Sequence, residues 1–348
     1  MRQINKVDQR VHLSFADVLL CPYEDDFCTI ESRNIPDLSS SVCTGVALKV
    51  PIITAPMDSV TTAEMAIAMH KCGGLGIHTR FINQDDELEK QIVGVKQIAS
   101  TGALAACAVG VKGSPHKSVY DHVQVLCDFG LKIVCLDIAN GSHIFMARAI
   151  ESIIKLKDKY GINIIAGNVA TGISARRLAN CGAGAIKIGI GGGAICVTRR
   201  VTGFGVPQFT AILECVDALT GLDVCVIADG GIRNSGDMVK ALWAGADCVM
   251  SGFLFSGHDE CPNFNGQKQY RGMASRTVSR RDDVAPEGVC INVEEKGPVE
   301  NTMRELASAL RAGLSMGNAR NLKELRENVR CIRVSTMSND ESDPIKII

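Results

Sequence analysis

The chain has 348 residues, of which 46% are hydrophobic and 22% charged, so it can bury a large core and lacks the composition of a disordered protein. Lys and Arg number 37 against 38 Asp and Glu, and this net charge of −1 gives no electrostatic basis for binding nucleic acid or an anionic membrane. The N-terminal sequence MRQINKVDQR has no apolar segment of a secretion signal, and no apolar run is long enough to span a bilayer. These features predict a soluble, cytoplasmic protein.

The 15 cysteines form no CxxC pair and no regular Cys/His spacing, so neither a zinc site nor a disulfide framework is predicted. Most of them lie in apolar stretches, where a thiol packs as a small hydrophobic side chain. This pattern is typical of a protein from a reducing compartment.

Eight short apolar runs recur along the chain, each followed by a longer amphipathic stretch. They cover residues 50–56, 74–79, 103–110, 133–140, 162–168, 185–191, 223–231 and 248–253. Near-continuous apolar strands that alternate with helices indicate a parallel sheet covered on both faces. An open doubly wound sheet has the same alternation, but eight units favour a closed (β/α)₈ TIM barrel, formed by a single domain over residues 1–348.

Many of these runs end in Asp, Asn, His, Arg or Gly, and in a barrel those strand ends form the catalytic face. Two segments interrupt the repeat: a glycine-rich loop at 191–206 and a polar stretch at 258–300, expected to be a mobile flap. Helical periodicity returns from Pro298 to about Leu325, and residues 338–348 have the composition of a tail.

Cys196 lies in the first of these segments, after a strand that runs into glycines, and Thr198 follows two positions later. Glycines let the backbone approach a ligand closely, and a thiolate in a polar loop is a strong nucleophile. Among 15 cysteines, one loop cysteine is also compatible with an incidental position.

Two further glycine-containing turns, at residues 227–233 and 250–253, end the seventh and eighth predicted strands. In TIM barrels these two strand ends form the usual phosphate site, with backbone amides as donors. Asp229 is anionic, so we expect it to accept hydrogen bonds from a sugar rather than to face a phosphate.

Six blocks in chain order together resemble the IMP dehydrogenase/GMP reductase family. They are residues 15–20 (FADVLL), 55–60 (APMDSV), 167–169 (GNV), the Cys196 loop, 229–233 (DGGIR) and 270–273 (YRGM). Several blocks in the correct order are much more specific than one motif. The resemblance implies a TIM barrel that assembles as a homotetramer, a purine nucleoside 5′-monophosphate as substrate, a nicotinamide cofactor, and a covalent bond between Cys196 and purine C2.

The resemblance also implies individual roles. Cys196 would be the nucleophile, Thr198 a proton relay, and Glu287 the group that binds the purine N1 edge and passes a proton through Thr198. Substrate contacts would come from Asp229 (ribose), Gly231, Gly252 and Tyr270 (phosphate), and Gly230, Gly272, Met273 and Gly288. Cofactor contacts would come from His78, Arg80, Asp137, Asn140 and Gly141. A potassium ion would bind backbone carbonyls of Gly191, Gly193 and Cys196.

The family has two activities that share the covalent step. The dehydrogenase passes hydride from IMP to NAD⁺ and then hydrolyses the intermediate to XMP with an Arg–Tyr pair, whereas the reductase releases ammonia from GMP and uses NADPH to give IMP. Residues 274–290 contain Arg280 and Arg281 but no Tyr, so the base for hydrolysis is missing and the reductase is favoured. Residues 136–141, 256–260 and 321–325 also resemble the reductase, whereas 55–58 and 73–77 are closer to the dehydrogenase.

Only helix-length sequence separates residues 79 and 103, so the dehydrogenase's regulatory modules are absent. Ala194 replaces a usual phosphate-binding Ser, Gly192 replaces a common Pro, and Arg80 stands near the place of a cofactor-binding Lys. NADPH is therefore expected, with NADH open, and the substrate could be a modified or deoxy purine nucleotide. Further alternatives are a dehydrogenase without regulatory modules, a flavin-dependent barrel oxidoreductase, and a non-catalytic nucleotide-binding relative.

Overall fold

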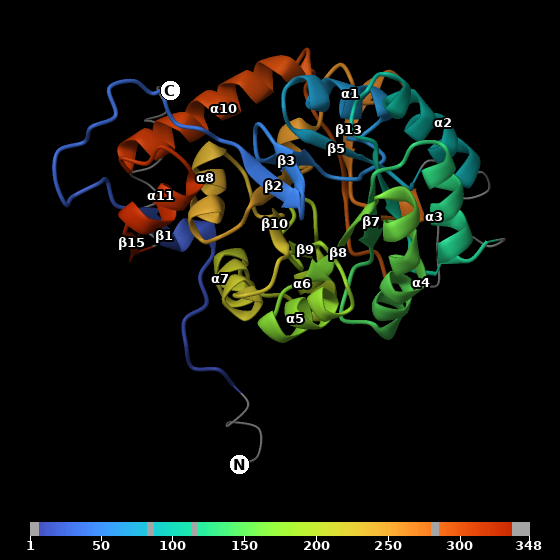
Figure 1. Ribbon diagram of the computed structural model, residues 1–348, viewed down its shortest axis with the longest axis horizontal. Coiled ribbons are helices and arrows are strands. Elements are labelled where there is room, and N and C mark those ends of the chain that lie inside the picture. Colours follow the sequence, from blue (N-terminus) through green and yellow to red (C-terminus); the bar gives the residue numbers. More distant parts are fainter. Residues whose placement is uncertain (1–6, 82–86, 113–116, 280–284, 336–348) are drawn as a thin grey trace.

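The structure is a computed structural model that describes residues 7–81, 87–112, 117–279 and 285–335. Its centre is a closed barrel of eight parallel strands, in which each strand pairs with the next in chain order and the last pairs with the first (Figure 1). The strands are β4 (Ile52–Thr54), β5 (Leu75–His78), β6 (Ala106–Val109), β7 (Ile133–Asp137), β8 (Asn163–Val169), β9 (Ala185–Ile188), β10 (Cys225–Asp229) and β11 (Cys248–Ser251). Each predicted apolar run supplies one strand, so the barrel is confirmed and the open sheet is wrong.

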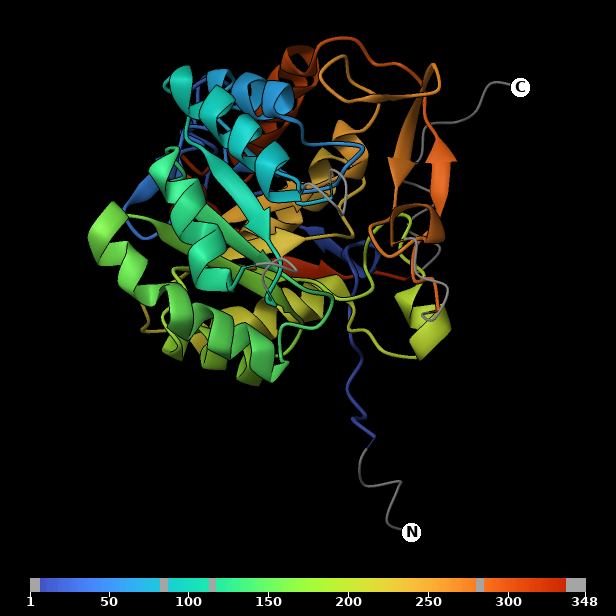
Figure 2. The same cartoon turned by 90° about the vertical axis from the view of Figure 1, so that its right-hand side faces the viewer.

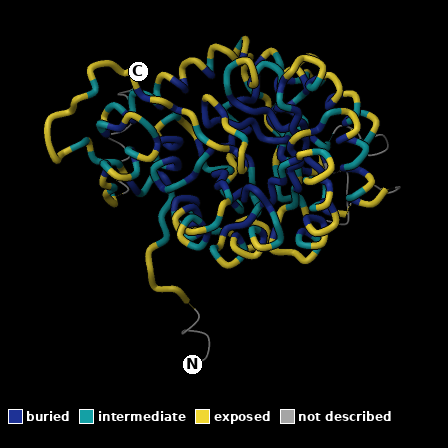
Figure 3. The backbone as a smooth tube through the Cα atoms, in the orientation of Figure 1, coloured by how far each residue is buried: buried dark blue, intermediate teal, exposed yellow. Residues whose placement is uncertain are grey.

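Small and branched side chains fill the barrel interior, among them Ile53, Cys135 and Ile227. A hairpin of β2 (Ser40–Cys43) and β3 (Val46–Leu48) packs into the same cluster and contacts β8, β10 and β11. Eight of the 15 cysteines are buried and all are free thiols. The interior is therefore a packed apolar core, and Figure 3 shows the central strands as mostly buried.

Helices surround the barrel (Figures 1 and 2). They are α1 (Ala63–Lys71), α2 (Glu87–Ser100), α3 (Val119–Asp128), α4 (Ile144–Tyr160), α5 (Gly172–Asn180), α7 (Gln208–Leu219), α8 (Ser235–Trp243) and α10 (Val299–Met316). Thr62, Ser118 and Asn234 cap three of them, because each side chain accepts a hydrogen bond from a first-turn amide. Among the described residues, no helix is long and apolar enough to cross a membrane.

The C-terminal stretch expected to be helical, from Pro298 to about Leu325, forms two helices. α10 ends at Met316, and α11 spans Leu322–Asn328. Asn318 between them has a left-handed φ of 48°, and its backbone amide bonds to Ser315 O, so the chain turns there. The β-strands β1 (Val18–Leu20) and β15 (Cys331–Arg333) pair beside these helices, next to the short 3₁₀ helix η2 (Phe15–Asp17).

The two segments outside the repeat contain regular structure. The 191–206 loop includes the short helix α6 (Thr198–Thr202). After the 3₁₀ helix η3 (Phe253–Phe255), the 258–300 segment forms an antiparallel sheet of β12 (Asn263–Phe264), β13 (Gln267–Arg271) and β14 (Cys290–Asn292), with α9 (Arg276–Ser279) between the last two. Figure 2 shows this sheet on the same side of the molecule as α6. Arg280, Arg281 and the 338–348 tail lie outside the described residues.

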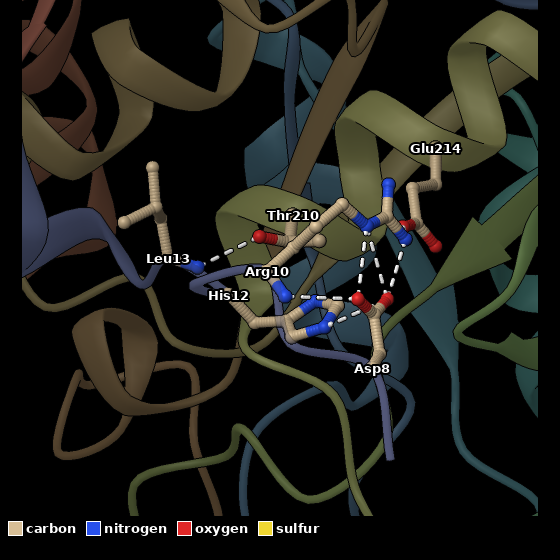
Figure 4. Close-up of polar contacts among 6 residues, drawn as sticks. All are labelled: Asp8, Arg10, His12, Leu13, Thr210 and Glu214. Carbon is tan, nitrogen blue, oxygen red and sulfur yellow. Dashed lines mark hydrogen bonds and ion pairs between the residues drawn. The ribbon is translucent and has the colours of Figure 1, made fainter. Parts of the chain in front are cut away.

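The N-terminal arm lies along α7 (Figure 4). The Leu13 amide donates to Thr210 Oγ1 at 2.7 Å, and Arg10 contacts Glu214 at 3.1 Å. Arg10 also forms hydrogen bonds with Asp8, although exposed ion pairs of this kind add little stability. The arm thus covers the helix that follows the 191–206 loop.

Candidate active site

A thiol, a hydroxyl and a carboxylate form a chain at the end of β9. Cys196 Sγ lies 3.1 Å from Thr198 Oγ1, and Thr198 Oγ1 donates to Glu287 Oε2 at 2.7 Å. All three residues are partly exposed, so a ligand can reach them. A hydroxyl held between a nucleophile and a carboxylate can move a proton from one to the other.

Backbone pairing brings Glu287 to Thr198 although 89 positions separate them. Cys196 and Gly288 form an isolated antiparallel bridge, in which Val197 N donates to Glu287 O at 2.9 Å and Val289 N to Ile195 O at 3.2 Å. The position of the carboxylate is thus fixed by the main chain of the Cys196 loop.

A third segment pairs on the other side of the 287–289 segment. Gly272 N donates to Val289 O at 2.9 Å, and Glu287 N donates to Ala274 O at 3.0 Å. A Cβ at Gly272 would lie only 2.9 Å from the Gly288 Cα, so the approach of these segments requires glycine. The structure thus brings Gly288 next to the nucleophile and Gly272 next to Gly288, and Met273 follows Gly272 in the same turn.

The glycine turn after β10 contacts the Cys196 loop. Gly230 and Gly231 have φ values of 91° and 77°, which glycine adopts without strain. A Cβ at Gly230 would lie 3.3 Å from Gly193 N, so the turn after β10 touches the Cys196 loop through backbone atoms. This contact leaves a surface of main-chain groups, as an anion site requires.

Tyr270 reaches the end of β11. A Cβ at Gly252 would lie 2.9 Å from the Tyr270 hydroxyl and 2.5 Å from Met57 Sδ. Tyr270 is buried, and burial raises the pKa of its phenol, so the hydroxyl keeps its proton and remains a hydrogen-bond donor. Two residues assigned to the phosphate from sequence are therefore neighbours in space.

Lys187 is a site residue that the sequence reasoning missed. Its ammonium lies 3.0 Å from Asp137 Oδ1 and 3.1 Å from Asp229 Oδ2, and it also donates to Asn168 Oδ1. A single charged residue inside the apolar run 185–191 was the available signal. Burial opposes ionisation of Asp137, but the charges of Lys187 and Arg80 outweigh it and hold the Asp137 pKa below its usual value.

The proposed cofactor residues fall into two groups. The Arg80 guanidinium carbon lies 4.0 Å from the centroid of the Phe81 ring, and the Arg80 charge acts on Asp137. Gly141 N donates to Asn168 O at 2.7 Å, and Asn140 is exposed in the same turn as Gly141. These four residues therefore surround one region of the barrel mouth.

His78 is not brought to that region. Its Nδ1 lies 2.9 Å from Thr79 O, and a Cβ at Gly94 would overlap its ring, so the ring packs against α2. The physical reason is strand alternation: Ile77 faces the barrel interior, and the next side chain points outward.

The residues present fit the potassium ion and the nicotinamide cofactor that the family resemblance implies. The carbonyls of Gly191 and Cys196 accept no hydrogen bond from the described residues, and the Gly193 carbonyl accepts one, from Cys196 N at 3.1 Å. These hard oxygens suit a potassium ion; no cluster of three or more His, Cys, Asp or Glu suited to a metal occurs in the described part of the chain. Arg80 Nε is buried without a partner there, which fits an anionic group of a nicotinamide dinucleotide.

Comparison with known proteins gives a consistent result over the whole chain. The family described as "IMP dehydrogenase / GMP reductase domain" matches residues 12–345. GMP reductase of Ascaris suum is 33% identical over 97% of both chains, and GMP reductase 1 of Mus musculus is 34% identical over 96% of this chain and 98% of its own. Inosine-5′-monophosphate dehydrogenase of Borreliella burgdorferi is 32% identical over 98% of both chains.

Proposed function

Because this chain belongs to the IMP dehydrogenase/GMP reductase family, we propose that it is a GMP reductase that converts GMP to IMP and ammonia with NADPH. The observation that carries the proposal is Thr198, whose hydroxyl bonds to both Cys196 Sγ and Glu287 Oε2. Such a chain serves the protonation of a leaving amine. Residues 274–290 contain no tyrosine, so the base that the dehydrogenase uses for hydrolysis is missing.

In the first step the Cys196 sulfur attacks C2 of GMP, the C2–N bond to the exocyclic amine breaks, and a C2–S bond forms. The proton lost by the thiol balances the proton gained by the departing ammonia, and Thr198 and Glu287 provide its route. NADPH supplies a hydride to C2 when bound. The C2–S bond then breaks, the product is IMP, and the released thiolate takes up a proton.

The other residues position the nucleotide. Asp229 Oδ2 is bound by Lys187 and Asn168, while Oδ1 has no partner among the described residues and accepts from a ribose hydroxyl. Tyr270 and the amides around Gly231 and Gly252 hold the phosphate, and Gly272 and Met273 line the base pocket. Gly230 and Gly288 are further substrate contacts.

Arg80, Asp137, Asn140 and Gly141 hold the cofactor, with NADPH preferred over NADH. A potassium ion binds the carbonyls of Gly191, Gly193 and Cys196 and shapes the loop. We further propose that the 258–300 segment moves as a flap over a single barrel domain, that the protein acts in the cytoplasm, and that it is a homotetramer.

One observation favours a second substrate class. Ala194 offers no hydroxyl beside Cys196, so one phosphate contact of the family pattern is lost, at a cost on the order of 1 kcal/mol. Gly192 and Arg80 also depart from the family pattern, so the chain is a divergent member, and a modified or deoxy purine nucleotide is the second candidate.

The test is the absorbance of reduced nicotinamide, followed with two substrate pairs in potassium buffer. GMP with NADPH should lose absorbance, and Cys196→Ala should abolish the loss. A gain with IMP and NAD⁺, accompanied by XMP, would instead assign the chain to the dehydrogenase branch. Nucleotide binding without turnover in either pair would contradict the proposed reaction.

A further inference from the structure

Lys187 is a buried lysine with every ammonium proton engaged. Its side chain is 3% exposed, and its neighbours Ile186 and Ile188 in β9 are fully buried and apolar. Nζ donates to Asp137 Oδ1, Asp229 Oδ2 and Asn168 Oδ1. An ammonium has three protons, so the three acceptors satisfy it completely.

These acceptors come from three strand ends around Lys187. Asp137 ends β7, Asn168 lies near the end of β8, and Asp229 ends β10, so the four residues span four consecutive strands of the barrel. The proposed cofactor-side carboxylate and the proposed ribose-side carboxylate thus share one nitrogen. Without the ammonium, two close carboxylates would repel each other and turn away.

Asn168 extends this network to the nucleophile's loop. Its Nδ2 donates to Asp229 Oδ2 at 2.8 Å and to Gly189 O at 2.8 Å, and Gly189 follows β9 two residues before the 191–206 loop. The backbone of Asn168 also accepts from Gly141 N at 2.7 Å, on the cofactor side. Every part of the network is therefore attached to a residue of one of the two proposed ligand sites.

Resting on the proposed function, we propose that Lys187 is a positioning residue that couples the binding of the purine nucleotide to the binding of the nicotinamide cofactor. A nucleotide that bonds to Asp229 Oδ1 orders Asp229, and the shared ammonium orders Asp137 at the same time. The cofactor then binds to a site in which Asp137 is already ordered, so its binding costs less conformational entropy. By reciprocity, a bound cofactor tightens the binding of the nucleotide by the same factor.

A purely structural lysine would behave differently. Its loss would lower stability and weaken both ligands, but it would leave unchanged the factor by which one ligand tightens the other. The coupling factor, measured at equilibrium, is therefore the decisive quantity.

The experiment compares wild type with Lys187→Met, which keeps the length without the charge, and Lys187→Arg, which keeps the charge in a planar group. Calorimetry measures the dissociation constant of GMP with and without saturating NADP⁺. We expect at least about a fivefold coupling in wild type, about none in Lys187→Met, and an intermediate factor in Lys187→Arg. Lys240→Met is the matched control, because Lys240 is half-buried with its ammonium 2.9 Å from Phe15 O, outside the network; it should keep the wild-type factor.

Lys187→Met leaves two carboxylates without a cation, so the double variant Lys187→Met/Asp137→Asn serves if the single variant does not fold. Wild-type coupling in either folded variant, or no coupling in wild type, overturns the proposal. Failure of the proposed function is read separately, from turnover: a wild type that converts IMP with NAD⁺ overturns GMP reduction, and the coupling is then measured with that pair. If wild type binds neither GMP with NADP⁺ nor IMP with NAD⁺, both the coupling and the proposed function are refuted.

Discussion

Thr198 Oγ1 donates to Glu287 Oε2 at 2.7 Å, across 89 positions of sequence, and the pairing of Cys196 with Gly288 fixes this contact. The hydroxyl lies between the proposed nucleophile and a carboxylate, so it can pass a proton from one to the other.

Thr198→Ala should lower kcat for GMP reduction on the order of 10²-fold, because the departing amine loses its proton source. Thr198→Ser keeps a hydroxyl at the same position and should keep most of the activity. With NADPH deuterated at the transferred position, the isotope effect on kcat should approach 1 in Thr198→Ala, since ammonia release then limits the rate. An isotope effect that grows in Thr198→Ala would contradict this role.

Tyr270→Phe should raise the KM for GMP by about 10- to 100-fold with little change in kcat, because a hydrogen bond to a charged phosphate contributes about 1.5–3 kcal/mol. Steady-state kinetics at saturating NADPH measures both constants. Tyr160→Phe is the control, since Tyr160 also donates, to Asp128 at 2.6 Å, but lies at the end of α4 outside the site. Equal KM values for the two variants would remove Tyr270 from the phosphate site.

His122 should make the protein acid-sensitive. It is buried, its Nε2 lies 2.7 Å from Gln91 Oε1, and burial lowers its pKa to about 4. Because the folded pKa lies below the unfolded value of 6.5, its contribution to stability is complete above about pH 6.5 and is lost as the pH falls toward 4, by up to about 3 kcal/mol.

His122→Gln has no titrating group there, and its amide can still donate to Gln91. Urea unfolding at several pH values should show a smaller loss of stability in this variant between pH 6.5 and 4. Identical slopes for wild type and variant would show that His122 titrates normally in the folded protein.

Asp58 changes the stability of the protein with pH in the direction opposite to His122. Burial raises its pKa to about 6, although Arg271 lies 3.5 Å away and favours the charged form. Its favourable contribution is therefore complete below about pH 3.8 and is lost as the pH rises through 6, again by up to about 3 kcal/mol. Relative to Asp58→Asn, wild type should lose stability between pH 4 and 7; a difference that does not change with pH would refute the raised pKa.

The barrel was predictable because each strand is a short apolar run with turn residues at its end, and all eight runs, such as 133–140, contain a strand. The break between α10 and α11 was not, because the residues around Asn318 interrupt the helix by a local turn inside an otherwise continuous periodicity. The sheet inside 258–300 was also missed, since β13 reads QKQYR, a polar strand.

The residues of the candidate site were likewise only partly predictable from the sequence. Residues next to Cys196 were found from their motif, and Glu287 only through the family pattern, because the contact that matters is a backbone pairing distant in sequence. His78 was placed with the cofactor residues through the family pattern, but the alternation of side chains along β5 turns its ring toward α2. Lys187 was overlooked because it lies inside an apolar strand, where its charge required partners from β7, β8 and β10.

The central claim is reduction of GMP through Cys196, and the most direct measurement follows ammonia and IMP after the protein is mixed with GMP and NADPH. Ammonia and IMP should appear in equal amounts, one of each per NADPH oxidised, and Cys196→Ser should produce neither. Production of XMP from IMP and NAD⁺ without ammonia release from GMP, or turnover of GMP by Cys196→Ser at the wild-type rate, would contradict the account.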